Sequence, residues 1–355
     1  EFFPRTQPNV SLTLRQPIFR GFREYAGLRQ YRHLSAAQKQ AYGRAFLDLH
    51  NEVAQSYYGV LAREQDLANL KAERELYQGR VGELRGRVRA GTSSETDLLS
   101  SEAADARIGA QLKEAESSLQ GAREAFVFLT GYSRDVELAL AEVKNPAPQS
   151  VESYLAGIEK RPDLLGAIER REAADEAVKV AWGGHLPSID VLGNYYLKRP
   201  EGVFSEINWD VQATLTLPIY SGGIVSAQVT QAALQREQSE LEITRLRRLA
   251  DQEIRTLYAA YRSDLDSIYG LEKAVAFSEK NYTLLRRDYR RGLTRNLDVL
   301  QAQSSSLEAR RALTLARFTA KNTWIRLQAA SGNVQLEEPA APEPAPARPA
   351  GETVK

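Results

Sequence analysis

The sequence predicts a mainly helical fold with a few β-strands, built from two tandem copies of a strand, helix, helix unit. Two observations indicate the unit. Residues 207–217 alternate between apolar and polar side chains, as in a strand with two unlike faces. After Pro218 and Gly222 the apolar residues recur every three, four or seven positions along a proline-free segment that reaches Gly292, as on a long helix with one apolar stripe.

The duplication is visible at a constant spacing. The pentapeptide PIFRG, from Pro17 to Gly21, matches PIYSG, from Pro218 to Gly222, 201 positions later. The same spacing relates pairs throughout the rest of the unit: Gly91 and Gly292, Asp97 and Asp298, Gly131 and Gly332. Internal repeats change the predicted fold as a whole, so the chain is expected to hold two related units. We place them at residues 1–160 and 161–332, followed by a Pro- and Ala-rich tail at 333–355 that we expect to be disordered.

Composition gives no indication of catalysis or of a nucleic-acid partner. The 355 residues carry a net charge of +1, with acidic and basic side chains interspersed along the predicted helices. Cysteine is absent, which excludes disulfides and thiolate metal sites. His33, His50 and His185 are scattered rather than spaced as metal ligands, and no phosphate-binding glycine loop is present. We therefore expect no enzyme activity, no cofactor and no bound metal.

In the first copy, Val10, Leu12 and Leu14 form the apolar face of a strand, and a helix is expected from Gly21 to about Arg89, on the order of 100 Å long. Gly91 ends that helix, and the spacing of Ser94 and Asp97 predicts a capping box for a shorter return helix, about 95–129. Residues 132–162 contain several prolines and are expected to form an irregular connection. The apolar stripe of the long helix is predicted at nine positions: Leu49, Val53, Tyr57, Val60, Leu67, Leu70, Val81, Leu84 and Val88.

The second copy adds a short helix at 162–182 and an alternating strand at 186–196, joined by a loop at 198–206 to the strand that ends at Pro218. The stripe of its long helix is predicted at Leu257, Tyr261, Leu265, Ile268, Leu271, Val275, Tyr282, Leu285 and Tyr289. Aromatic residues cluster near the ends of these strands: Tyr195, Tyr196, Phe204, Trp209 and Tyr220. They are expected to form an aromatic belt in a membrane barrel, with core packing in a soluble sheet as the alternative.

So few strands cannot close a sheet by themselves, and an open sheet edge cannot lie in lipid. The first copy begins part-way through the unit, so a complete copy is expected to add a helix and a strand before Glu1, giving four strands per chain. Three such chains would close a 12-stranded β-barrel continued by a 12-helix tube.

From about Asn9 to Gly332 the chain resembles the TolC-like outer membrane factors, the channel proteins of tripartite efflux pumps and type I secretion systems. The resemblance is carried by the two Pro-x-x-x-Gly crossings and by the two turns in which Gly91 and Gly292 precede Asp97 and Asp298 by six positions. It implies a homotrimer in the outer membrane of a Gram-negative bacterium, with a lipid-embedded β-barrel and a periplasmic helical tunnel. The implied function is a passive exit duct. Its implied partners are a periplasmic adaptor (membrane fusion) protein and an inner-membrane transporter of the RND, ABC or MFS type.

The resemblance also implies roles for residues at the second turn. Asp298 matches the aspartate that lines the periplasmic aperture, and Gln301 stands where a second acid is often found. A ring of three Asp298 carboxylates would favour cations. Asp97 and Tyr289 match a pair that links neighbouring tip helices in the closed state, and Arg295, offset by one position, is expected to add a charged link. The alternative for both aspartates is a purely structural role in the first turn of a helix, where a carboxylate meets the helix dipole.

Two other classes of protein have long helices. A soluble, elongated coiled-coil scaffold would not need duplicated amphipathic strands with aromatic ends. A periplasmic adaptor would show one helical hairpin flanked by other modules rather than a tandem copy. The repeat argues against both.

Overall fold

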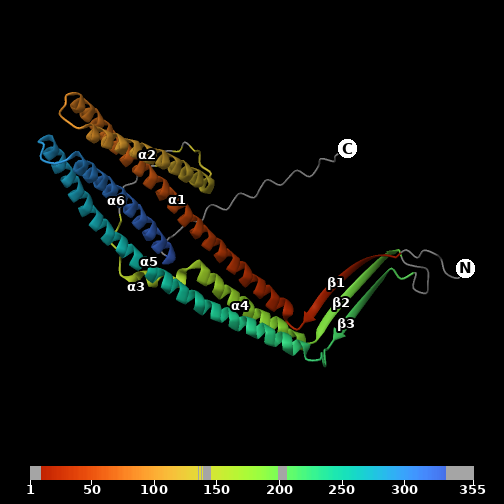
Figure 1. Cartoon of the computed structure of the whole chain (residues 1–355). Coiled ribbons are helices and arrows are strands. Elements are labelled where there is room, and N and C mark those ends of the chain that lie inside the picture. Colours follow the sequence, from red (N-terminus) through yellow and green to blue (C-terminus); the bar gives the residue numbers. More distant parts are fainter. Residues whose placement is uncertain (1–8, 135, 137, 139–144, 199–205, 333–355) are drawn as a thin grey trace, which may run out of the picture. The chain divides into compact units, whose positions relative to one another are not determined.

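The computed structural model describes residues 9–134, 136, 138, 145–198 and 206–332 (Figure 1). Phe204, most of the loop predicted at 198–206 and the tail at 333–355 lie outside the described residues. In chain order the elements are β1 (Val10–Arg20), α1 (Arg23–Arg89), α2 (Glu95–Thr130), α3 (Val151–Leu155), η1 (Ile158–Lys160), α4 (Pro162–Trp182), η2 (Gly183–His185), β2 (Ser188–Lys198), β3 (Trp209–Thr216), α5 (Ile224–Arg290) and α6 (Asn296–Ala330). The described fold is mainly helical with three strands, as the sequence predicts.

The chain divides into two compact units, and α1 and α5 each contribute to both. The first unit holds the described residues up to Ala45 together with Ile158–Gln252, and the second holds the described residues of Phe46–Gly157 and those from Glu253 onward. Each unit therefore takes material from both sequence repeats. No helix in the described ranges combines the length and apolar character needed to cross a bilayer.

In the first unit the three strands form an antiparallel sheet in the order β1-β2-β3 (Figure 1). Leu12, Tyr195 and Trp209 lie side by side in one row across the strands. The neighbouring row is polar: Thr13 donates a hydrogen bond to Asn194 (2.9 Å), and Asn194 donates to Asp210 (2.9 Å). Because side chains alternate along a strand, the two rows face opposite sides of the sheet. The period-2 prediction is therefore confirmed in all three strands.

Glycine makes the passage from β1 to α1 possible. Gly21 has φ +62°, and a Cβ there would meet the carbonyl of Gly183 and, at 2.8 Å, the Cβ of Leu186. The crossing thus packs directly against the end of α4. Gly222 and Gly223 repeat the left-handed conformation between β3 and α5, with φ of +62° and +81°. Pro17 lies within β1, as expected for a strand that runs to Phe19, and it stands next to a register shift, where proline is tolerated.

The second unit is built on the two helical hairpins α1/α2 and α5/α6. Its core joins α1, α2 and α6 through Leu70, Tyr77, Ile108, Leu112, Leu300 and Leu307. All nine stripe positions predicted for α5 are buried or half-buried, which confirms that stripe. In α1 the prediction was wrong for Leu49, which is exposed, and it missed Glu73, Tyr77 and Arg80, all buried. The physical reason is that this face of α1 is covered by α2 and α6, so Tyr77 joins the core and Arg80 is bonded to Asn296.

The connection between the repeats is more ordered than predicted. Residues 151–155 form α3, and Tyr154 is buried against the ring of Tyr258, with 6.1 Å between ring centroids. Tyr261, fully buried on α5, donates a hydrogen bond of 2.5 Å to the carbonyl of Pro146. The prediction of an irregular segment was therefore wrong at residues 151–160, because aromatic packing on α5 orders the chain there.

Candidate functional site at the hairpin turns

The two hairpins of the second unit end in turns that keep the symmetry of the repeat. Gly91 (φ +68°) and Gly292 (φ +75°) end α1 and α5, as predicted. In both copies the aspartate in the first turn of the return helix accepts a hydrogen bond from the hydroxyl four positions earlier. Ser93 donates to Asp97 Oδ2 (3.2 Å), and Thr294 donates to Asp298 Oδ2 (3.0 Å). We call residues 80–102 and 286–301 together the tip.

The residue that caps the return helix differs between the copies. At α2 the Ser94 hydroxyl accepts a hydrogen bond from the Asp97 amide (3.1 Å), which is one half of the predicted capping box. At α6 the capping position is Arg295, whose amide donates to Asp298 Oδ2 (3.2 Å) and whose guanidinium lies 3.4 Å from Oδ1. The hydrogen bond from Thr294, followed by that from the Arg295 amide, lowers the pKa of Asp298 below its ordinary value. Asp298 is therefore charged at neutral pH, and Arg295 lies beside it.

Asn296 is the centre of the tip, and the sequence analysis did not single it out. Its side chain is 1% exposed. Oδ1 accepts two hydrogen bonds from Arg80 of α1, from Nε at 2.9 Å and Nη2 at 2.6 Å. Nδ2 donates to the Asp97 carbonyl (2.9 Å) and to Ser101 Oγ (3.2 Å) on α2. One amide side chain thereby joins the start of α6 to both helices of the first hairpin.

Tyr289 supports the same junction through its ring. The guanidinium carbon of Arg80 lies 4.7 Å from the ring centroid, and that of Arg87 lies 5.6 Å from it. Burial lowers the pKa of Arg80, and the positive charge is stabilised by the ring face and by the Asn296 carbonyl oxygen. A signal for Arg80 was present in the sequence, since this arginine falls on the stripe of α1.

The structure does not bond the predicted pair Asp97 and Tyr289 to each other within one chain. The Asp97 carboxylate accepts from Ser93, whereas Tyr289 lies beneath Arg80 and Arg87. A link between these residues of neighbouring chains stays a prediction. Gln301 is exposed on α6, one turn after Asp298, as expected for the same helix face.

The predicted interface aromatics lie in the first unit. Tyr195 and Trp209 are cross-strand partners on the apolar face of the sheet, and both are exposed. Tyr220 is also exposed, after the end of β3, and Tyr196 is half-buried. Exposed aromatics on one face of a sheet are compatible with a lipid-facing belt.

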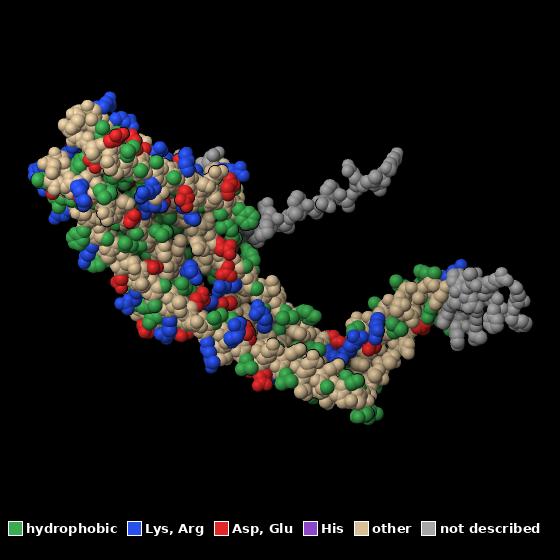
Figure 2. Space-filling view, in the orientation of Figure 1, with side chains coloured by type: hydrophobic (Ala, Val, Ile, Leu, Met, Phe, Trp, Pro, Cys, Tyr) green, Lys and Arg blue, Asp and Glu red, His purple; other side chains and the backbone are tan. Residues whose placement is uncertain are grey.

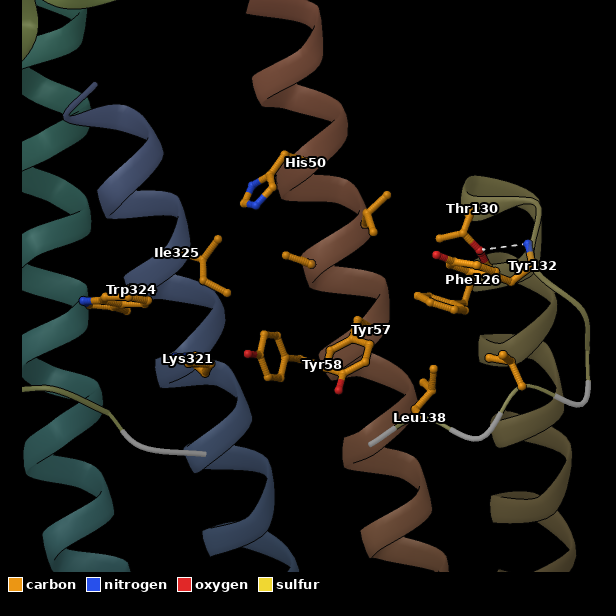
Figure 3. A pocket seen from close by; sticks show the side chains of 13 residues that line it. His50, Tyr57, Tyr58, Phe126, Thr130, Tyr132, Leu138, Lys321, Trp324 and Ile325 are labelled. Atoms are coloured by element: carbon orange, nitrogen blue, oxygen red, sulfur yellow. Dashed lines mark hydrogen bonds between the residues drawn. The ribbon is translucent and has the colours of Figure 1, made fainter. Parts of the chain in front are cut away.

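An aromatic cavity of about 650 Å³ in the second unit was not predicted (Figure 3). Tyr57 and Tyr58 enter it from α1, Phe126 from α2, and Lys321 with Trp324 from α6. The Lys321 ammonium lies 4.4 Å from the Trp324 ring centroid, and burial lowers its pKa. Within the described part of the chain, no group of three or more histidine, aspartate or glutamate side chains is placed to hold a metal ion.

A duplicated strand-to-helix crossing, a two-faced sheet and polar hairpin turns together define the class of the outer-membrane channel-tunnels. The sequence matches the model of the outer membrane efflux protein family over residues 4–132 and 156–333, and the chain belongs to this family.

Individual relatives agree with this assignment. The chain is 26% identical over 344 residues to the proteases secretion protein PrtF of Dickeya chrysanthemi, covering 92% of this chain and 73% of the relative. It is 24% identical over 347 residues to the outer membrane protein TolC of Escherichia coli K12, covering 93% and 70%. Among solved structures, the outer membrane protein VceC of Vibrio cholerae superposes with a TM-score of 0.79 at 21% identity, covering 91% of this chain and 79% of that one. The chain is thus an outer-membrane exit duct for efflux or type I secretion.

Proposed function

We propose that three copies of this chain form a passive exit duct whose strands close a 12-stranded barrel in the outer membrane and whose helices form a 12-helix tunnel in the periplasm. The two-faced sheet supports this arrangement. Its three described strands leave β1 and β3 each with one unpaired edge within a single chain, and such edges must be paired before a sheet can lie in lipid.

The observation that carries the gating part of the proposal is the buried contact between Arg80 and Asn296. It joins the α5/α6 hairpin to the α1/α2 hairpin at the tip, where Asp298 would line the aperture and Gln301 would follow it. Hydrogen bonds to a charged group are worth about 1.5–3 kcal/mol each, so this junction holds the hairpins together without making their separation prohibitive. Opening then consists of the α5/α6 hairpin moving away from the α1/α2 hairpin.

Partners follow from the same arrangement. A duct without an energy source needs a transporter in the inner membrane, of the RND, ABC or MFS type, and a periplasmic adaptor that reaches the tip. The similarity to a protease secretion protein supports a polypeptide as one class of cargo, and the description of the family supports efflux as the other kind of transport. In either case the chain performs no chemical step.

The oligomeric mass and the conductance of the purified full-length protein test the proposal. We expect a trimer in detergent that forms small pores in planar bilayers. Replacing Asp97 by Ala and Tyr289 by Phe should raise single-channel conductance if these residues link neighbouring chains. A water-soluble monomer or dimer without conductance would overturn the duct and favour the coiled-coil scaffold. If the variant with both substitutions still forms an intact trimer and its conductance is unchanged, Asp97 and Tyr289 do not link neighbouring chains, but the proposed duct stands.

A further inference from the structure

The second turn of the tip carries an excess of positive charge that the proposed carboxylate ring does not balance. Between residues 286 and 298 the chain has two aspartates and five arginines: Arg286, Arg287, Arg290, Arg291 and Arg295. All five arginine side chains are exposed. Lys and Arg side chains lie at the ends of both hairpins in Figure 2.

Both aspartates are already neutralised locally. Asp288 pairs with Arg287 (3.2 Å), and Asp298 pairs with Arg295 (3.4 Å). Arg286, Arg290 and Arg291 have no ion-pair partner in the ranges that the structure describes. In the first turn, by contrast, Arg85 pairs with Glu102 (2.7 Å) and Arg87 with Glu83 (2.7 Å). The surplus therefore belongs to the second turn.

Helix stability does not account for this surplus. Arginines in the last turn of α5 are favourable, because a helix C-terminus attracts cations. Arg295, however, stands at the N-terminus of α6, where the helix dipole disfavours a positive charge and where the first copy has Ser94, a better cap. Arg291 lies in the turn itself, outside both helices. Arg291 thus occupies a position that helix stability does not explain, whereas Arg295 is held by its contacts with Asp298.

We propose that the tip of this duct attracts anions, and that its cargo is an anionic molecule bearing carboxylate or phosphate groups. The inference rests on the proposed trimeric duct. The screening length is about 8 Å at physiological ionic strength. Arg290 lies about 3 Å along the helix axis from Gly292 and therefore acts on the entrance, whereas Arg286, about 9 Å away, is largely screened. Three chains multiply the surplus, and a pore mouth lined by one sign of charge concentrates ions of the other sign. Asp298 alone would favour cations at the aperture, but the neighbouring arginines outnumber it.

Ion selectivity in planar bilayers tests the proposal. With the full-length trimer in a potassium chloride gradient, the reversal potential should show a preference for chloride. Arg290→Gln combined with Arg291→Gln should lower the chloride-to-potassium permeability ratio at least about twofold, because it removes two unpaired charges per chain near the entrance. The matched control is Arg248→Gln, an exposed arginine about 66 Å from Gly292 along the helix axis, which should leave the ratio unchanged.

Two probes added on the tip side distinguish the source of the anionic groups. Block of the current by a hexaglutamate peptide but not by citrate indicates an acidic polypeptide, and block by both indicates small anions as well. Hexalysine should not block. The proposal that the entrance attracts anions would be overturned by a conducting trimer that prefers potassium. It would also be overturned if the double variant left the chloride-to-potassium permeability ratio unchanged. In both cases the proposed duct would stand. Absence of any pore would instead overturn the duct.

Discussion

Arg80 and Asn296 lie 216 positions apart in the sequence, yet two hydrogen bonds of 2.9 and 2.6 Å join the Arg80 guanidinium to the Asn296 carbonyl oxygen. Both side chains are buried. The contact breaks the symmetry of the repeat, since the position equivalent to Asn296 in the first copy is Glu95, which is exposed. A duplicated architecture has thereby acquired one asymmetric junction at the tip.

Replacing Asn296 by Ala is expected to destabilise the tip by about 2–4 kcal/mol, because it leaves the buried Arg80 charge without its acceptor. Thermal unfolding in detergent, followed by circular dichroism, measures the loss. Asn281→Ala is the matched control, an exposed asparagine at the α5 position equivalent to Arg80, and should change stability by less than about 0.5 kcal/mol. Equal melting temperatures for Asn296→Ala and the unmodified protein would contradict the role of the junction.

Glu73→Gln is expected to stabilise the second unit at neutral pH. Burial of Glu73 raises the pKa of its carboxyl, and the nearby Gln303 amide and Arg310 charge oppose this only in part. A raised folded pKa means that the folded state binds the proton more tightly than the unfolded state, so stability is highest below the ordinary carboxyl pKa and falls as pH rises through the folded value.

The gain from Glu73→Gln should therefore be present at pH 7–8 and vanish toward about pH 4, where the wild-type carboxyl is protonated in both states. Melting temperature against pH measures this. Glu75→Gln changes an exposed carboxylate on the same helix and should give no such pH-dependent gain. A stabilisation that persisted undiminished at acid pH would disprove the assignment to Glu73 ionisation.

Gly183→Ala is expected to weaken the crossing between β1 and α1, because the new methyl group would lie 2.5 Å from the Gly21 carbonyl oxygen and 2.7 Å from Arg23 Cγ. Overpacking of this kind costs about 1–3 kcal/mol. Gly270→Ala provides a comparison of opposite sign, because its added methyl group meets nothing within 4 Å beyond the adjacent backbone of its own helix, and alanine favours a helix interior by about 0.5–1 kcal/mol. The two variants should shift the melting temperature in opposite directions, and a shared direction would refute the close approach.

Tyr261→Phe should cost about 1 kcal/mol, since it removes the hydrogen bond that ties the connection at Pro146 to α5. Desolvation raises the pKa of Tyr261 to about 12, so the hydroxyl stays protonated and donates throughout the physiological range. Limited proteolysis between residues 145 and 162 is the sensitive readout, with faster cleavage expected in the variant. Tyr269 is exposed and lies about two helical turns after Tyr261 on α5, so Tyr269→Phe should leave the cleavage rate unchanged.

Much of the architecture was accessible from the sequence alone. The constant spacing between Pro17 and Pro218, and between Gly91 and Gly292, locates both crossings and both turns, because a positive φ and a change from strand to helix period each demand particular residues at particular places. The predicted bounds of α1, α2 and α4 agree with the observed elements to within about two residues, which is the usual uncertainty of helix ends. The stripe of α5 followed from periodicity, since an apolar face of a long helix has to be covered.

Only the tertiary structure decided which polar residues are buried and with what. Arg80 and Glu73 lie on the stripe of α1 as charged residues, and periodicity alone cannot distinguish a buried arginine from a break in the stripe. The partner of Arg80 lies on α6, so its identity depends on how two hairpins pack rather than on any local pattern. The order of residues 151–160 was hidden for the same reason, because the burial of Tyr154 against α5 selects that conformation over the irregular one that the nearby prolines suggest. Local propensities determine the elements of this chain, whereas contacts between distant segments determine its charged interior.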